Sequence, residues 1–179
     1  MKYDYLAIEK KWQEKWEAAG VFRALDEKEA GGKPKFYALV EFPYPSGAGM
    51  HVGHIKAYSG LEVVSRMRRM QGYNVLFPMG FDAFGLPTEN YAIKTGMHPR
   101  AVTDKNIAKF TQQLKRVGYG FDWGRVIDTT DEDYYRWTQW IFLKMFEAGL
   151  AFRDTALVNY CPTCKVVLSN EDSQGGMLD

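Results

Sequence analysis

The stretch FYALVEFPYPSGAGMHVGH at residues 36–54 decides the fold. It opens with an apolar run, FYALVEF, that is typical of a short buried strand. The segment PYPSGAGM at 43–50 ends this strand, because proline and glycine interrupt the pattern. Residues 51–71 then have the spacing of a long helix that ends at Gly72, and YNVLF at 73–77 predicts a second strand. Strand, helix and strand in this order predict a βαβ unit with parallel neighbouring strands.

Helical patterns flank this unit on both sides. Residues 4–19 are amphipathic, and we interpret the spacing of Trp12 and Trp16 as core packing. Two further helices are expected near 104–117, with Thr103 as N-cap, and near 131–148, where an apolar face from Tyr134 to Met145 also predicts core packing. The segment PMGFDAFGLP predicts a loop at 78–87. Together these elements predict an α/β fold with helices flanking a parallel sheet.

Composition excludes several classes of protein. The chain has 179 residues, 46% of them hydrophobic, which suits a folded domain. Its 23 Lys+Arg nearly balance 22 Asp+Glu, so a broad cationic surface for nucleic acid or membrane is not expected. No run approaches the roughly 18 apolar residues of a membrane span, and the first residues lack a signal pattern. We therefore expect a cytoplasmic protein without a membrane partner.

The candidate site begins at His51-Val52-Gly53-His54, directly after the first strand and its loop. In an open α/β sheet, ligands bind beyond the carboxyl ends of the strands, where a helix N-terminus offers N–H groups to phosphate. Gly47, Gly49 and Gly53 remove side chains where a nucleotide would approach the backbone. Two imidazoles can donate hydrogen bonds to phosphate oxygens, so the pattern predicts a nucleotide site.

A bare HxGH pattern leaves a structural alternative open, in which His51 caps the helix and His54 fills a gap. The chain has neither G-x-x-x-x-G-K-[ST] nor G-x-G-x-x-G, so a P-loop and a dinucleotide fingerprint do not explain the glycines. A metal site at the two histidines would be incomplete, because an acidic or sulfur ligand is not nearby in the sequence.

The two cysteines, Cys161 and Cys164, form a C-P-x-C pair. This spacing predicts half of a tetrahedral Zn²⁺ site, and a redox pair is the alternative. The other two ligands of a closed site are not apparent, so we expect weak or absent zinc in this chain.

Other polar residues have structural interpretations. We interpret His98 as a loop residue and expect Asp122 to pair with Arg125. A solvated face near a helix C-terminus is expected for a basic cluster, Arg66, Arg68 and Arg69.

The segment PYPSGAGMHVGH resembles the nucleotide-binding signature of the class I aminoacyl-tRNA synthetases, with HVGH in place of the HIGH motif. Four further segments resemble those of the leucyl-tRNA synthetases in the same order: GFDAFGLPTE at 80–89, FDWGR at 121–125, EDYYRWTQWIF at 132–142 and VNYCPTCKVVLSNE at 158–171. The chain departs from the pattern at Phe81 and Tyr160, where the family has Trp, and by one inserted residue in GAGM. Both exchanges keep aromatic bulk.

The resemblance implies a Rossmann-like catalytic domain that activates leucine with ATP and Mg²⁺ and passes it to tRNA(Leu). It implies that residues 1–157 form the N-terminal half of this domain and that 158–179 begin a connective, zinc-binding insertion. Asp82 would hold the α-ammonium group of leucine, and Phe42 and Tyr44 would line its pocket. The implied contacts to ATP are Pro45, Ser46, Gly47, His51, Gly53 and His54.

The sequence shows no KMSKS-like loop, editing domain or anticodon-binding helices. We therefore expect the chain to bind ATP and leucine but to have little aminoacylation activity of its own. An uncovered strand edge and helix face would favour self-association. Two other functions remain open: a non-catalytic nucleotide or amino-acid binding module, and a free-standing nucleotidyltransferase, which also uses HxGH at a helix start.

Overall fold

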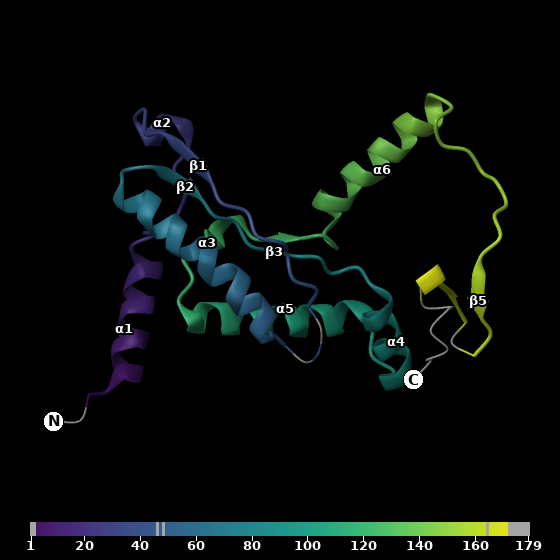
Figure 1. The fold of residues 1–179 in the computed structure, drawn as a ribbon, viewed down its shortest axis with the longest axis horizontal. Helices are drawn as coiled ribbons and strands as arrows, with labels where there is room; N and C mark the ends of the chain where they lie inside the picture. Colours follow the sequence, from purple (N-terminus) through teal and green to yellow (C-terminus); the bar gives the residue numbers. More distant parts are fainter. Residues whose placement is uncertain (1–2, 46, 48, 164, 172–179) are drawn as a thin grey trace. The chain divides into compact units, whose positions relative to one another are not determined.

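The computed structural model describes residues 3–45, 47, 49–163 and 165–171 (Figure 1). The chain divides into two compact units, Met1–Arg136 and Trp137–Asp179. This division reflects which residues contact one another and does not test where a domain ends. The domain boundary expected between residues 157 and 158 therefore stays a prediction.

The first unit contains most of the regular structure. Its helices are α1 (Tyr5–Ala18), α2 (Glu27–Ala30), α3 (Val52–Met70), α4 (Leu86–Thr95), α5 (Pro99–Val117) and the 3-10 turn η1 (Trp123–Arg125). Its strands are β1 (Lys35–Tyr37), β2 (Asn74–Leu76), β3 (Gly80–Phe81) and β4 (Ile127–Asp128). Helix α6 (Glu132–Glu147) crosses the boundary between the units.

The predicted βαβ unit is confirmed, since β1 and β2 pair in parallel and α3 connects them. Strands β3 and β4 form a second parallel pair. Backbone hydrogen bonds join these short strands into one layer: Ala38 N–H donates to Leu76 O at 2.9 Å, and Asp122 N–H donates to Phe77 O at 2.8 Å. Segment 74–82 therefore lies between segment 35–43 and segment 122–129.

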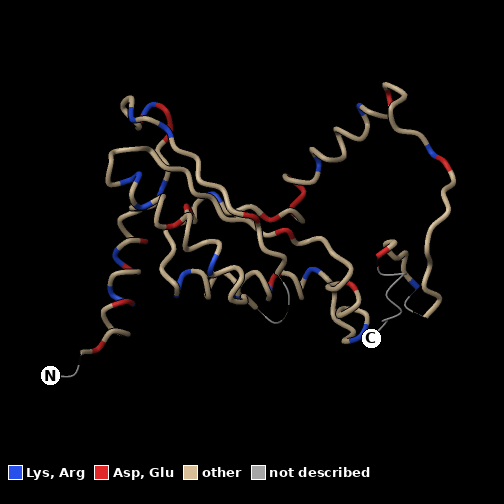
Figure 2. The backbone as a smooth tube through the Cα atoms, in the orientation of Figure 1, with Lys and Arg blue, Asp and Glu red and all other residues tan. Residues whose placement is uncertain are grey.

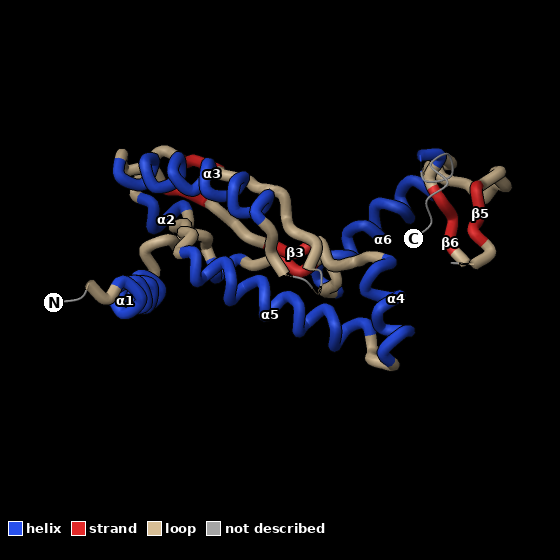
Figure 3. The backbone as a smooth tube through the Cα atoms, turned by 60° about the horizontal axis from the view of Figure 1, so that its bottom comes forward, coloured by secondary structure: helices blue, strands red, loops and turns tan. Residues whose placement is uncertain are grey.

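Helices α3 and α5 cover one face of this layer (Figure 3). Tyr58 of α3, Leu114 of α5 and the strand residues Phe77 and Phe121 belong to one buried cluster. Phe77 and Phe121 lie with their ring centroids 4.3 Å apart. Two right-handed crossovers that advance in the same direction place their helices on the same face, which explains the single core.

The strand predicted at 36–42 is shorter and less buried than expected. Only 35–37 form β1, and the side chains alternate beyond it: Ala38 and Val40 are buried, whereas Tyr37 and Leu39 are more than half exposed. This alternation is that of a strand with a helix layer on one face only.

One strand and two helices differ from the sequence prediction. Segment 78–87, predicted as a loop, contains β3 and the start of α4. Helix α5 begins at Pro99 rather than near 104, because the imidazole of His98 accepts a hydrogen bond from Arg100 N–H (3.2 Å) and proline suits the first helical position. Thr103, the predicted cap, is buried inside the helix.

The basic cluster at the end of α3 is not a solvated face, and that prediction was wrong. Arg66 donates to Gly118 O at 2.8 Å, and Arg69 donates to Gly120 O at 3.0 Å. Glu62, which is 7% exposed, pairs with Arg66 and accepts from Gly120 N–H. Burial lowers the pKa of the Arg69 guanidinium. These side chains satisfy the backbone groups that follow α5.

Core packing was wrongly predicted for Trp12 and for the face of α6, but not for Trp16. Helix α1 follows its N-cap Asp4 and contains no fully buried residue, and Trp12 is 47% exposed. Trp16 is partly buried, and its ring lies edge-on to Phe22 with centroids 5.8 Å apart. Basic and acidic residues are mixed along this helix (Figure 2). Helix α6, which carries the Tyr134 to Met145 face, likewise has no buried residue. Self-association through such faces stays a prediction.

The second unit contains an antiparallel hairpin of β5 (Asn159–Cys161) and β6 (Val166–Leu168). Lys165 adopts a left-handed conformation with φ 57°, and its N–H donates to Cys161 O at 2.8 Å. This bond closes the turn between the two strands.

Within the described part of the chain, we find no helix with both the length and the apolar character needed to cross a membrane.

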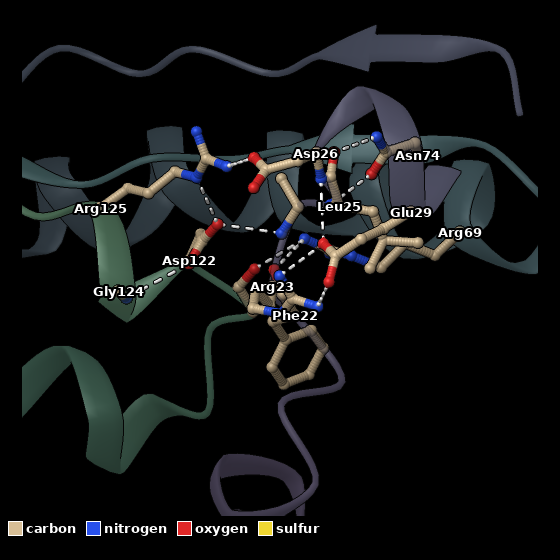
Figure 4. Close-up of polar contacts among 12 residues, drawn as sticks. Phe22, Arg23, Leu25, Asp26, Glu29, Arg69, Asn74, Asp122, Gly124 and Arg125 are labelled. Atoms are coloured by element: carbon tan, nitrogen blue, oxygen red, sulfur yellow. Dashed lines mark hydrogen bonds and ion pairs between the residues drawn. The ribbon is translucent and has the colours of Figure 1, made fainter. Parts of the chain in front are cut away.

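A buried carboxylate fastens the segment before β1 to the layer (Figure 4). Asp122, which is 2% exposed, accepts hydrogen bonds from Ala24 N–H (2.9 Å) and Gly124 N–H (3.2 Å). The guanidinium group of Arg125 lies 3.4 Å from the same carboxylate, so the predicted pair is confirmed. The same guanidinium group also forms an ion pair with Asp26 at 2.8 Å.

We predict that Asp122→Ala lowers the free energy of unfolding by about 3 kcal/mol, because it leaves buried donors without an acceptor. Asp104→Ala is the matched control: Asp104 pairs with Arg100 on the surface of α5, and its loss should cost about 0.5 kcal/mol or less. Urea unfolding measures both changes. Equal losses would contradict the role assigned to Asp122.

Candidate active site

The site lies at the carboxyl edge of the parallel layer, where two loops meet. The loop after β1 contains Pro43, whose carbonyl oxygen accepts a hydrogen bond from Asp82 N–H (3.2 Å) in the loop after β3. Helix α3 starts at Val52, at the end of the first of these loops. The fold therefore brings the HVGH segment and the Asp82 loop to the same edge, as the sequence predicts.

His51 and His54 close the first turn of α3 with a reciprocal pair of hydrogen bonds. Gly53 N–H donates to His51 Nδ1 at 3.1 Å, and His51 N–H donates to His54 Nδ1 at 3.2 Å. The two rings are stacked, with centroids 3.9 Å apart. His51 is therefore the N-cap, as the structural alternative proposed.

These bonds decide which nitrogen of each neutral imidazole carries the proton. A ring nitrogen that accepts a hydrogen bond has no hydrogen of its own. Both Nδ1 atoms accept, so the hydrogen-bond pattern assigns the proton of His51 and of His54 to Nε2. Capping the helix thus leaves two Nε2–H donors at its N-terminus.

The environment of His54 favours the neutral ring. Its pKa is lowered from the ordinary value first by burial and then by the neighbouring His51, with a smaller opposing effect of Glu41. The rings of Tyr58 and Phe110 face it at centroid distances of 5.8 and 6.1 Å. A second proton on Nδ1 would also displace the hydrogen bond from His51 N–H.

Gly53 makes room for the capping imidazole, because a Cβ atom at this position would lie 2.9 Å from His51 Cε1. Its predicted contact to ATP stays a prediction. Steric contact with Phe42 similarly requires a glycine at position 80, where a Cβ atom would lie 2.5 Å from the Phe42 ring.

The aromatic residues of the first loop are held by the second. The hydroxyl of Tyr44 accepts a hydrogen bond from Thr88 N–H (3.0 Å) in the first turn of α4 and contacts Thr88 Oγ1. Phe42 packs on Gly80, and the side chain of Asp82 is exposed to solvent. Sequence analysis made no prediction for Thr88, because the predicted loop ended at 87 and no helix was predicted at 88–95.

The remaining predicted residues are placed as follows. Pro45 is buried and Gly47 is exposed, while Ser46 lies outside the described residues. Cys161 is buried in β5 of the second unit, and its predicted partner Cys164 also lies outside the described residues. Among the residues that are described, no group of three or more His, Cys, Asp or Glu gathers as a metal site. The zinc half-site stays a prediction.

A parallel sheet edge beside the capped start of a crossover helix is typical of α/β proteins, which bind their ligands at this position. Residues 11–175 match the family of tRNA synthetases of class I (I, L, M and V), and the chain belongs to this family.

Its relatives point to one branch of the family. The chain is 58% identical over 98% of its length to the leucine-tRNA ligase of Alkaliphilus oremlandii, and 54% identical over its whole length to that of Chlorobaculum tepidum. It also resembles a solved ternary complex of LeuRS, tRNA and LeuAMS from Agrobacterium radiobacter K84, with a TM-score of 0.84 and 36% identity over 95% of the chain. The chain spans 21% and 22% of the two ligases and 22% of the solved LeuRS chain.

The lowered pKa of His54 predicts a dependence of stability on pH. Unfolding returns the imidazole to an ordinary pKa of about 6.5, so the unfolded chain binds a proton that the folded chain resists. His54 should therefore destabilise the fold as the pH falls from about 7 through 6.5.

His54→Asn removes this titration while its Oδ1 can still accept from His51 N–H. We predict that the free energy of unfolding of the wild type falls more steeply than that of His54→Asn between pH 7.5 and 5. Urea unfolding at several pH values measures both curves. Parallel curves would contradict the burial argument.

Proposed function

We propose that this chain forms the ATP and leucine site of a leucine-tRNA ligase, in which leucine is activated to leucyl-adenylate. The observation that carries the proposal is the pair of Nε2–H donors at the start of α3, beside the Asp82 loop. The identity to two leucine-tRNA ligases supports it, as does the likeness to a LeuRS solved with LeuAMS.

The proposed reaction joins a carboxylate oxygen of leucine to the α-phosphorus of ATP, while the bond to the β-phosphate oxygen breaks and pyrophosphate leaves. During this step, negative charge is spread over the oxygen atoms of the α-phosphate group. In the proposed complex, that charge is stabilised by the Nε2–H groups of His51 and His54 and by the positive end of α3. Because the capping bonds orient both rings in advance, little reorganisation is needed when ATP binds.

Recognition of leucine is assigned to the two loops. The exposed carboxylate of Asp82 is a natural partner for the α-ammonium group of a free amino acid. Phe42 and Tyr44 are held in place by Gly80 and Thr88, so they provide a pocket wall of fixed shape. Such a wall separates side chains that differ by one methylene by only about 1–3 kcal/mol, so discrimination also needs editing elsewhere in a ligase.

Further parts of the proposal concern the longer ligase. In that ligase, Mg²⁺ binds together with ATP, and leucine is transferred to tRNA(Leu). Zinc binds at a site that includes Cys161 and Cys164, and the enzyme acts in protein synthesis in the cytoplasm. The chain spans about a fifth of its relatives, so these activities belong to the proposal for the whole protein.

We predict that the double variant His51→Asn/His54→Asn binds a non-hydrolysable leucyl-adenylate analogue about 100-fold more weakly. Asparagine can keep each capping acceptor but lacks the Nε2–H donor, and a hydrogen bond to a charged group contributes about 1.5–3 kcal/mol. Isothermal titration measures the affinity, and thermal unfolding shows that the cap is intact. Unchanged affinity would show that the phosphates bind elsewhere.

We predict that Asp82→Asn weakens leucine binding by about 10- to 100-fold and ATP binding by less than 3-fold, because only leucine carries the ammonium group. Glu89→Gln in the first turn of α4 removes a nearby exposed carboxylate and serves as the control. Equal losses for leucine and ATP would indicate a different role for Asp82.

A further inference from the structure

Two side chains of α5 hold the loop that precedes α3. Gln113 Oε1 accepts a hydrogen bond from Met50 N–H at 3.0 Å, and Lys109 Nζ donates to Gly47 O at 3.1 Å. They lie four residues apart, so both project from the same face of α5. Each contact joins residues more than sixty positions apart in the sequence.

Gly49 lies directly against this pair. A Cβ atom at position 49 would lie 2.9 Å from Gln113 Oε1 and 3.2 Å from Lys109 Cε, and the residue has φ 89°. Position 49 has no side chain between the loop and these two side chains of α5, and glycine tolerates its left-handed conformation.

Helix α5 is itself firmly placed. Phe110, adjacent to Lys109, is fully buried and contacts the rings of Phe81 and His54. Leu114, adjacent to Gln113, is fully buried in the main core. The two polar side chains therefore start from a firmly packed helix and reach Gly47 and Met50, which lie outside the helices and strands.

We propose that Lys109 and Gln113 are positioning residues, which hold the backbone of Gly47 and Met50 in the arrangement that receives ATP. This inference rests on the proposed function, which places ATP at that loop. A loop without these contacts would have to be ordered when ATP binds, and the ordering would subtract from the affinity. Leucine, which is assigned to the Asp82 side of the site, does not depend on them.

The test compares the 179-residue chain with the variants Lys109→Met and Gln113→Met, which keep side-chain length but lose the hydrogen bonds. Lys105→Met and Gln112→Met are matched controls, because both residues are exposed on the same helix. Isothermal titration gives the dissociation constants of ATP and of leucine. Amide hydrogen exchange at Met50 reports the contact to Gln113.

We expect each contact variant to weaken ATP binding by about 5- to 30-fold, the effect of losing 1–2 kcal/mol, with leucine affinity within 2-fold of the wild type. Met50 should lose exchange protection in Gln113→Met, and Lys109→Arg, which keeps a donor, should restore most of the affinity. The controls should behave as the wild type.

ATP affinity that is unchanged while Met50 loses protection would overturn the positioning role. Equal losses for ATP and leucine would also overturn it, because they would indicate a general weakening of the fold. A wild-type chain that binds no ATP would instead refute the proposed function, and the positioning role with it.

Discussion

The parallel pairing of segment 74–82 with its two neighbours is the constraint on which the rest of the structure depends. Parallel strands end at the same edge, so the loop after β1, the loop after β3 and the start of α3 must meet there. The aromatic core around Tyr58, Phe77 and Phe121 fixes α3 against the strands, and the buried carboxylate of Asp122 fastens the segment that leads into β1. Residues far apart in the sequence thereby become neighbours in one site.

At that edge, the helix cap and the proposed chemistry use the same two imidazole rings. The first turn of any helix has N–H groups without intrahelical partners, and here two imidazoles contribute to satisfying them through Nδ1. The capping arrangement also leaves Nε2–H available and disfavours a second proton on His54, whose pKa burial already lowers. A structural interpretation of His51 and a functional one are therefore compatible, because the cap uses one nitrogen and a phosphate would use the other.

Sequence patterns predicted the features that depend on local periodicity and on chain order: the βαβ unit, the parallel pairing and the position of HVGH. They failed where long-range contacts decide the outcome. Helix α4 begins within a Gly-Leu-Pro sequence that also suits a loop, and its first turn is held by Tyr44, forty-four residues before Thr88. Arginine is typical of protein surfaces, so the sequence alone favours exposure of Arg66 and Arg69. In the fold, carbonyl oxygens of the turn after α5 accept hydrogen bonds from both side chains. Lys109 and Gln113 carried no signal at all, because only the fold brings α5 to the loop at 47–50.

The central claim is that the capping pair presents Nε2–H of both histidines to a phosphate group, and NMR of the imidazole nitrogens tests it most directly. In ¹⁵N-labelled protein at neutral pH, we expect His51 and His54 both to be protonated at Nε2 and not at Nδ1. We also expect the two Nε2 signals to shift on addition of a leucyl-adenylate analogue, with smaller changes at His98. A proton on Nδ1 of either ring, or Nε2 signals that do not shift when the analogue is added, would contradict the claim.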